Sequence, residues 1–178
     1  VVDETYINQI EFKTKTFKLF FNKIRQYLNQ DSNVLEIGSY YGILGNIIKS
    51  HVKNYTGLEL SDHAAEYAKK YFNLNIINQS LHKFFKNRFQ FDVIIMTDVI
   101  EHLDKPFDII NLIEKNLKPD GVLILSTYNI DSIIPRIMRS KYYWIIPMHK
   151  YYFSSSTLKY FLNKSNLHLF KIKNDARL

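Results

Sequence analysis

Short apolar runs alternate with helix-like patterns along most of this sequence. Between Thr5 and Asn29, apolar side chains recur at helical spacing with Lys and Gln between them, which predicts an amphipathic helix. Further helices are predicted at 43–50, 62–72 and 107–117. Strands are predicted at 34–37, 55–60, 74–77, 91–97 and 122–126, the last after a tight turn at 119–121. Because these runs do not alternate with polar residues, they favour an α/β fold with a doubly wound, mostly parallel sheet and helices on both faces.

The pattern changes after Tyr128. Residues 129–153 carry two prolines and a dense group of aromatic side chains, so we expect them to pack over the sheet as a lid. A helix is predicted at 155–166, with one of the serines at 154–156 as its N-cap. The stretch LHLFKIK at 167–173 is predicted to be a sixth strand.

The composition indicates one folded domain. The 178 residues are 46% hydrophobic and 15% aromatic, so we expect a single domain over 1–178 with residues 1–30 as its helical entry. The absence of cysteine excludes disulfides, thiolate metal sites and cysteine nucleophiles, and it fits a cytoplasmic protein. No apolar run approaches the roughly 18 to 20 residues that cross a bilayer, so no membrane span is expected. The net charge of +7 is scattered, which favours a solvated basic surface over a nucleic-acid-binding face.

The first predicted strand runs into a glycine-containing turn, VLEIGSYYGILG at 34–45. In an open α/β sheet the first strand-to-helix turn usually holds the ligand. A dinucleotide site has the spacing G-x-G-x-x-G, but Tyr40 stands between Gly38 and Gly42, which weakens a pyrophosphate-binding interpretation. Glu36 supports the same conclusion, because a carboxylate near the turn repels a polyanion and suits a ligand that carries ammonium and sulfonium charges.

An acidic residue ends the second predicted strand. Glu59 stands about 21 residues after Gly38, the spacing at which a carboxylate accepts hydrogen bonds from ribose hydroxyls. An adenosine ligand fits both this acid and the turn. Taken singly, each feature also has a purely structural explanation, because glycines follow many buried strands and an acid at a strand end often caps a helix.

On these residues the sequence resembles the class I S-adenosylmethionine-dependent methyltransferases, over about 28–173. The glycine motif of that family is acid-x-G-x-G-x-G; Glu36, Gly38 and Gly42 match it, and Tyr40 does not. The resemblance implies S-adenosylmethionine as cofactor and a Rossmann-like fold of seven strands, of which the seventh has no counterpart in these 178 residues. It also implies a set of cofactor-binding residues, namely Glu36, Gly38, Tyr40, Gly42, Glu59, Leu60, Gln79, Thr97 and Asp98.

The segment TDVIEHLDKP after the fourth predicted strand is the most specific part of the resemblance. It is similar to the methyltransferases related to the ubiquinone-biosynthesis O-methyltransferase, which carry acid-x-x-E-H-x-x-x-P at this place; Asp98, Glu101, His102 and Pro106 match. Downstream, His149 in PMHKYYF takes the place of a histidine that often precedes aromatic residues and a serine-capped helix in that group.

The chemistry of Asp98, Glu101 and His102 has several interpretations. We expect no metal; if the segment is helical, however, the three side chains share one face and are the candidate ligands of a divalent cation. They can equally act as metal-free acid or base, or only cap and orient the loop. Methyl transfer to a hydroxyl benefits from a base because the neutral oxygen is a poor nucleophile, so His102 and His149 are the candidate catalytic residues.

The expected function is therefore a cytoplasmic methyltransferase that moves a methyl group from S-adenosylmethionine to a small-molecule acceptor, at oxygen rather than nitrogen or carbon. A homodimer is one use of the aromatic surface. No nucleic-acid partner is expected, because the D/N-P-P-Y/F type of base-methylating motif is absent after the fourth strand. One alternative is a nicotinamide-dependent oxidoreductase, which needs the diphosphate contacts that Tyr40 hinders. Another is a non-catalytic methyltransferase-like binding module that has lost its cofactor.

Overall fold

The computed structural model describes residues 9–142 and 145–173. The chain divides into two compact units. The first holds Val1–Met96 and Asn116–Ile124, and the second holds Thr97–Lys115 and Leu125–Leu178. The predicted glycine turn therefore belongs to the first unit, and both predicted catalytic histidines belong to the second.

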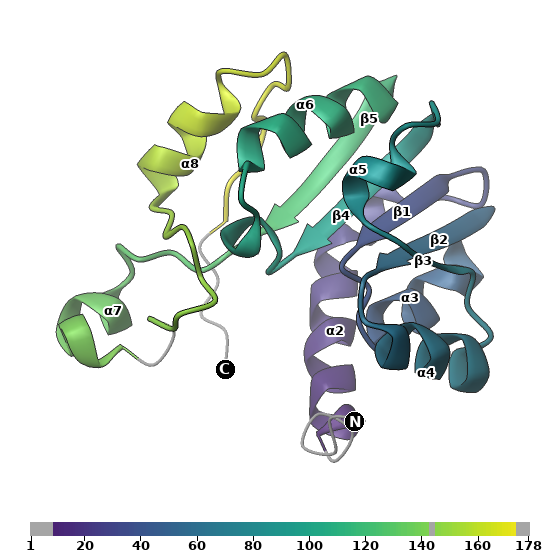
Figure 1. Ribbon diagram of the computed structural model, residues 1–178, viewed down its shortest axis with the longest axis horizontal. Coiled ribbons are helices and arrows are strands. Elements are labelled where there is room, and N and C mark those ends of the chain that lie inside the picture. Colours follow the sequence, from purple (N-terminus) through teal and green to yellow (C-terminus); the bar gives the residue numbers. More distant parts are fainter. Residues whose placement is uncertain (1–8, 143–144, 174–178) are drawn as a thin grey trace. The chain divides into compact units, whose positions relative to one another are not determined.

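The strands form one five-stranded sheet in the order β3-β2-β1-β4-β5 (Figure 1). They are β1 (Asn33–Ile37), β2 (Asn54–Glu59), β3 (Ile76–Asn78), β4 (Phe91–Thr97) and β5 (Leu117–Ser126). β1 pairs in parallel with both β2 and β4, and β2 pairs in parallel with β3. The chain moves outward from β1 to β3 and then returns to β4 on the other side of β1, which confirms the predicted doubly wound sheet.

Helices connect the strands. They are α2 (Ile10–Ile24), η1 (Arg25–Tyr27), α3 (Ile43–Ile48), η2 (Lys49–His51), α4 (Asp62–Phe72), α5 (Leu81–Phe84), η3 (Ile100–His102), α6 (Pro106–Asn116), α7 (Ile133–Met138), η4 (Arg139–Lys141) and α8 (Ser155–Leu162). α4 has the predicted bounds because the Ser61 side chain accepts from the Ala64 amide at its start and Asn73 takes a left-handed conformation at its end. In the part of the chain that the structure describes, no helix is both long and apolar enough to cross a membrane.

Helices α2, α3 and α4 cover one face of the sheet in the first unit. The residues that form this core include Phe21, Ile24, Val34, Leu44, Ile48, Ala65, Ala68, Val93 and Ile95. The alternate residues on the strands, Leu35, Ile37, Ile94 and Met96, are buried as well. The strands are thus covered on both faces, as the absence of apolar–polar alternation predicted.

The second unit has its own buried side chains and a well-defined helix start. Ile110 and Ile113 of α6 are fully buried. α8 begins with a capping box, in which the Ser154 hydroxyl and the Thr157 side chain each accept the other residue's backbone amide. The capping box confirms the predicted serine cap.

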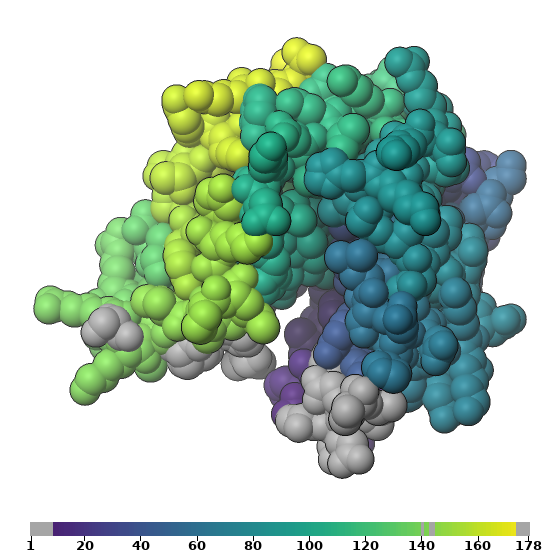
Figure 2. Space-filling view, viewed as in Figure 1, coloured from purple at the N-terminus to yellow at the C-terminus, as the bar shows by residue number. Residues whose placement is uncertain are grey.

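The predicted sixth strand is wrong. No strand is assigned to 167–173 within the described residues, and Phe170 is 65% exposed. Figure 2 shows yellow atoms of this end of the chain at the surface. A strand forms only where a neighbour completes its hydrogen-bond ladder, and no described strand pairs with this segment.

Several predicted boundaries also shift. α8 ends at Leu162 rather than at 166: the Leu162 carbonyl accepts from the amide and hydroxyl of Ser165, and the Asn166 amide donates to the Glu114 carboxylate instead of continuing the helix. The first helix ends at Ile24 and continues only as the short η1, and its predicted start lies outside the described residues. β5 includes the predicted turn, where the chain still bends sharply: a Cβ on Gly121 would lie 2.9 Å from the Lys118 carbonyl oxygen.

A buried acid lies in the core of the first unit. Glu36 is 2% exposed and accepts a hydrogen bond of 2.5 Å from the Tyr55 hydroxyl. Gly45 of α3 makes room for this phenol, because a Cβ at that position would collide with the Tyr55 hydroxyl. Burial raises the pKa of Glu36 to about 8, the Tyr55 bond lowers it, and the Glu59 carboxylate raises it further. The folded protein therefore holds Glu36 mainly protonated at neutral pH.

This raised pKa makes the stability depend on pH. The folded state keeps the Glu36 proton up to about pH 8, whereas the unfolded chain loses it near 4.5, so the free energy of unfolding falls as pH rises between these values. The Glu36→Gln variant has no such proton to lose. As pH rises through this window, we expect the free energy of unfolding of the variant to increase relative to that of the unsubstituted protein, by up to about 1.4 kcal/mol per pH unit. Urea denaturation across the window measures the difference, and parallel pH dependences would contradict the assignment.

The contact between Gly45 and Tyr55 predicts an unusual sign for a glycine substitution. Gly→Ala inside a helix ordinarily stabilises by about 0.5–1 kcal/mol. Gly45→Ala should instead destabilise by about 1–3 kcal/mol, because the new methyl overpacks against the phenol. In a Tyr55→Leu background the same change should cost less, which thermal or urea unfolding of the four proteins can show. Equal costs in both backgrounds would rule out the proposed clash.

Candidate cofactor-binding and active site

The turn after β1 places every second residue in the left-handed backbone region. Gly38, Tyr40 and Gly42 have φ angles of 72°, 46° and 78°. Gly42 also needs its small size, since a Cβ there would lie 2.7 Å from the Ala68 methyl. Tyr40 adopts its angle at a cost of about 1–2 kcal/mol, so contacts within the loop must offset this strain.

Glu59 supplies one such contact. Its carboxylate accepts hydrogen bonds from the backbone amides of Tyr40 at 2.8 Å, Leu60 at 2.9 Å and Ser61 at 2.8 Å. The bond from Tyr40 ties the β1 turn to the end of β2. A carboxylate offers about four acceptor sites, so these three bonds leave a site for a ribose hydroxyl. The anchoring also fixes the direction in which the carboxylate presents that site.

Two further predicted cofactor residues follow β2 and β3. Leu60 is 70% exposed directly after Glu59, and Gln79 is half-buried directly after β3. The strand register pairs Glu59 with Asn78, whose side-chain amide donates to the Glu59 carbonyl at 3.0 Å. The sequence predicted Gln79 as a substitute for the family's adenine-contacting acid and gave Asn78 no role. The Asn78 contact depends on the parallel register, which no local sequence pattern specifies.

Glu36 is placed differently from the other predicted cofactor residues. Its carboxyl group contacts Tyr55 in the core, and burial keeps it mainly protonated at neutral pH. A neutral carboxyl group attracts the cofactor's ammonium and sulfonium charges much less than a carboxylate does. Its contact with the cofactor stays a prediction, and Tyr55 is a partner that the sequence motif did not reveal.

The predicted residues that follow β4 lie in the second unit. Thr97 is half-buried at the end of the strand, and Asp98 follows it with φ of 54°. The Asp98 amide donates to the Ser126 carbonyl at 2.9 Å, so the chain turns off the strand instead of starting a helix. The prediction that Asp98, Glu101 and His102 share one helix face is therefore wrong, because only the latter two belong to the three-residue η3.

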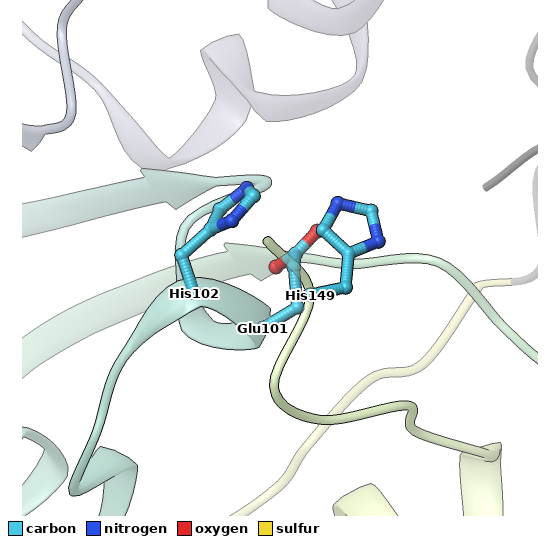
Figure 3. A group of neighbouring side chains, drawn as sticks. All are labelled: Glu101, His102 and His149. Carbon is cyan, nitrogen blue, oxygen red and sulfur yellow. The ribbon is translucent and has the colours of Figure 1, made fainter. Parts of the chain in front are cut away.

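Glu101 and His102 instead meet His149, and we call these three residues the imidazole–carboxylate cluster (Figure 3). One potential ligand atom from each residue lies within 4.8 Å of the other two. The two imidazole ring centroids are 4.7 Å apart, and Figure 3 shows the Glu101 carboxylate between the rings. The structure thus brings together both histidines that the sequence predicted to be catalytic, and His149 takes the place of Asp98 beside Glu101 and His102.

Hydrogen bonds between distant segments hold this cluster together. The Glu101 carbonyl accepts from the amides of Lys150 at 2.7 Å and Tyr151 at 3.2 Å. Nδ1 of His102 lies 3.0 Å from the Met148 carbonyl oxygen, so we assign the proton to this nitrogen. The bonds on both sides of the downstream histidine place its ring beside η3. The two segments are far apart in the sequence, and the motifs alone did not predict that they meet.

The Glu101 carboxylate is buried without a hydrogen-bond partner. The residue is 1% exposed, and neither carboxylate oxygen has a partner in hydrogen-bond geometry. Burial raises the pKa of Glu101 and the Asp98 charge raises it further, while its own amide, the Thr127 hydroxyl and the His102 ring lower it. An unsatisfied buried carboxylate costs at least about 1–3 kcal/mol. Unsatisfied buried polar groups of this kind are typical of residues that bind a ligand or an ion.

The predicted aromatic lid is partly core. Tyr142 and Phe153 are buried, whereas Tyr151 and Tyr152 are about 40% exposed. Residues 143–144 lie outside the described part of the chain. The exposed pair keeps the lid role open as a prediction, and the buried pair serves packing.

Comparison with known proteins agrees with the fold. Residues 10–172 match the family described as a methyltransferase domain. An uncharacterized RNA methyltransferase of Mycoplasma mobile is 34% identical over 115 residues, which are 61% of this chain and 31% of that protein. A ubiquinone biosynthesis O-methyltransferase of Actinobacillus pleuropneumoniae is 29% identical over 119 residues, 58% of this chain and 51% of that protein. The chain spans about half or less of the length of these relatives.

Solved structures show the same architecture. An S-adenosylmethionine-dependent methyltransferase from Archaeoglobus fulgidus has a TM-score of 0.74 at 19% identity, covering 91% of this chain and 73% of that one. The YcgJ protein of Bacillus subtilis has a TM-score of 0.64 at 16% identity, covering 88% and 67%. At these identities the likeness concerns the fold. The family match confirms the predicted methyltransferase class: the chain belongs to the methyltransferase-domain family.

Proposed function

We propose that this chain transfers the methyl group of S-adenosylmethionine to a hydroxyl oxygen of a small-molecule acceptor. The observation that carries the proposal is the Glu59 carboxylate, which three backbone amides hold at the end of β2 with an acceptor site left for ribose. Membership of the methyltransferase-domain family supports the reaction class. The ubiquinone biosynthesis O-methyltransferase among the relatives supports oxygen as the acceptor atom.

The cofactor would lie along the carboxyl ends of the first three strands. Glu59 accepts the ribose hydroxyls, the exposed Leu60 side chain covers one face of adenine, and Gln79 offers an amide to the adenine amino group. The backbone at Gly38 and Gly42 allows close approach of the methionine part. Thr97 and Asp98, which belong to the second unit, are cofactor residues on the family resemblance alone.

The transfer itself is a displacement at carbon. The acceptor oxygen forms a bond to the methyl carbon, the carbon–sulfur bond breaks with its electron pair on sulfur, and S-adenosylhomocysteine leaves. Positioning the two reactants supplies up to about 7–11 kcal/mol. The hydroxyl proton must also depart, and we assign this task to the imidazole–carboxylate cluster, with His149 as the proton acceptor and His102 oriented beside it.

The RNA methyltransferase among the relatives gives a specific reason to test a second acceptor class. The scattered positive charge and the absence of a base-methylating motif support the small-molecule acceptor. Release of S-adenosylhomocysteine, measured with catechol and with total transfer RNA as probes, separates the two. A cytoplasmic location and a homodimer stay proposals from the sequence.

The first test concerns Glu59 and the cofactor. We expect Glu59→Gln to weaken S-adenosylhomocysteine binding by about 10- to 100-fold, because a ribose hydroxyl loses a hydrogen bond to a charged group. Isothermal titration calorimetry measures the affinity, and thermal unfolding of the ligand-free variant checks that the loop survives. Asp62→Asn, an exposed acid at the start of α4, is the matched control and should bind like the unsubstituted protein. Unchanged affinity in a folded Glu59→Gln variant, or tight binding of NAD, would remove the cofactor assignment.

The second test concerns the proton. We expect His149→Gln to lower kcat by about 10²- to 10⁴-fold with S-adenosylhomocysteine affinity retained, because the base is lost while the cofactor contacts remain. His82→Gln, on the exposed surface of α5, is the control and should keep full turnover. Steady-state assays with whichever of the two probes is methylated give kcat, and calorimetry gives the affinity for S-adenosylhomocysteine. Full activity in His149→Gln would exclude this histidine as the base.

A further inference from the structure

The imidazole–carboxylate cluster has the composition of a metal site. Two imidazoles and one carboxylate offer three ligand atoms that lie within 4.8 Å of one another. Tetrahedral ligands at about 2.1 Å from a cation are about 3.4 Å apart, so small side-chain rotations bring this set to coordination distance. Glu101 and His149 are buried, and His102 is half-buried, so the cluster is only partly open to solvent.

Two features independent of proximity support a cation. Metal-binding histidines usually donate the ring N–H that faces away from the metal to a carbonyl, and Nδ1 of His102 has this bond to the Met148 oxygen. That bond leaves Nε2 with a free lone pair. The two oxygens of Glu101 are buried and no donor reaches them in hydrogen-bond geometry, so the nearby Thr127 hydroxyl and His102 ring compensate this carboxylate only in part.

We propose that Glu101, His102 and His149 bind one divalent transition-metal cation. Nitrogen ligands favour zinc and its first-row neighbours, whereas magnesium and calcium prefer all-oxygen sites. Three protein ligands leave a fourth position open, as in zinc sites that act on a bound oxygen. Asp98, which the sequence grouped with Glu101 and His102, is not one of the three; its charge lies near enough to raise the pKa of Glu101 and adds to the negative field around the ion.

The cation also gives the acceptor hydroxyl a place to bind. An oxygen in the open position loses its proton more easily because the cation stabilises the alkoxide or phenolate. With the cation bound, the proton passes to water and His149 is a ligand, whereas His149 is the proton acceptor only in the metal-free protein. This role rests on the proposed function, but binding of the cation does not.

Zinc binding to the full chain, without cofactor or acceptor, tests the site directly. After dialysis against a chelator, calorimetry with Zn²⁺ should show one tight equivalent, and Mg²⁺ should show none. Glu101→Gln and His149→Gln should each weaken zinc binding by at least about 100-fold, since each removes a direct ligand. His82→Gln should bind zinc like the unsubstituted protein. Co²⁺ in place of Zn²⁺ should give the visible absorption bands of a low-coordinate site, and both variants should lose them.

The outcomes are decisive in both directions. Absence of one tight zinc equivalent in the folded protein, or retention of that equivalent in folded Glu101→Gln and His149→Gln, overturns the metal site. In that case the cluster binds no metal, and the turnover of His149→Gln alone decides whether His149 is the base. If zinc binds but no methyl transfer occurs in its presence or absence, the proposed function fails and the metal site remains.

Discussion

The proposed cofactor site at the turn after β1 and the end of β2 depends on the hydrogen bond from the Tyr40 amide to the Glu59 carboxylate. It closes the turn after β1 onto the end of β2, and it does so with a residue that has a side chain where the family usually has a glycine. The backbone angle of Tyr40 carries strain, and a charge-assisted hydrogen bond of this kind is strong enough to offset it. The same carboxylate accepts the first amides of the chain that leads into α4. One side chain therefore positions the turn, the strand end and the helix start.

Three buried glutamates show how the environment decides the chemistry of one residue type. Glu36 has a phenol as partner and a pKa raised to about 8, so it is a neutral core group in the folded protein. Glu59 accepts hydrogen bonds from three backbone amides, which fix the orientation of its carboxylate. Glu101 has no hydrogen-bond partner for its side chain and lies between two imidazoles. Only the last of these leaves a buried charge to be compensated from outside the protein.

The sequence predicted the parts that depend on local pattern. The apolar runs predicted the doubly wound sheet and the bounds of α4 and β4, and the serines predicted the cap of α8. The predicted sixth strand does not form because a strand needs a second strand to pair with, and residues 167–173 pair with none of the described strands. No sequence pattern indicates the Tyr55 contact of Glu36, because this contact needs Gly45, on a helix, to leave space for the phenol.

In the candidate site, too, the sequence predicted the features set by local spacing but not the contacts between distant segments. The glycine turn and Glu59 were predictable, since their spacing along the chain sets their chemistry. The place of Asp98 was not predictable, because this residue takes a left-handed backbone conformation that puts it outside the helical turn of Glu101 and His102. His149 was predicted as a residue but not as a neighbour of Glu101, a contact made by backbone bonds between distant segments.

The most direct test of the central claim is an experimental structure of the chain with S-adenosylhomocysteine bound. The account predicts ribose hydroxyls within hydrogen-bond distance of the Glu59 carboxylate, with the Tyr40 amide still bonded to that carboxylate. A ribose bound elsewhere, or a Tyr40 side chain that occupies its place, would contradict it.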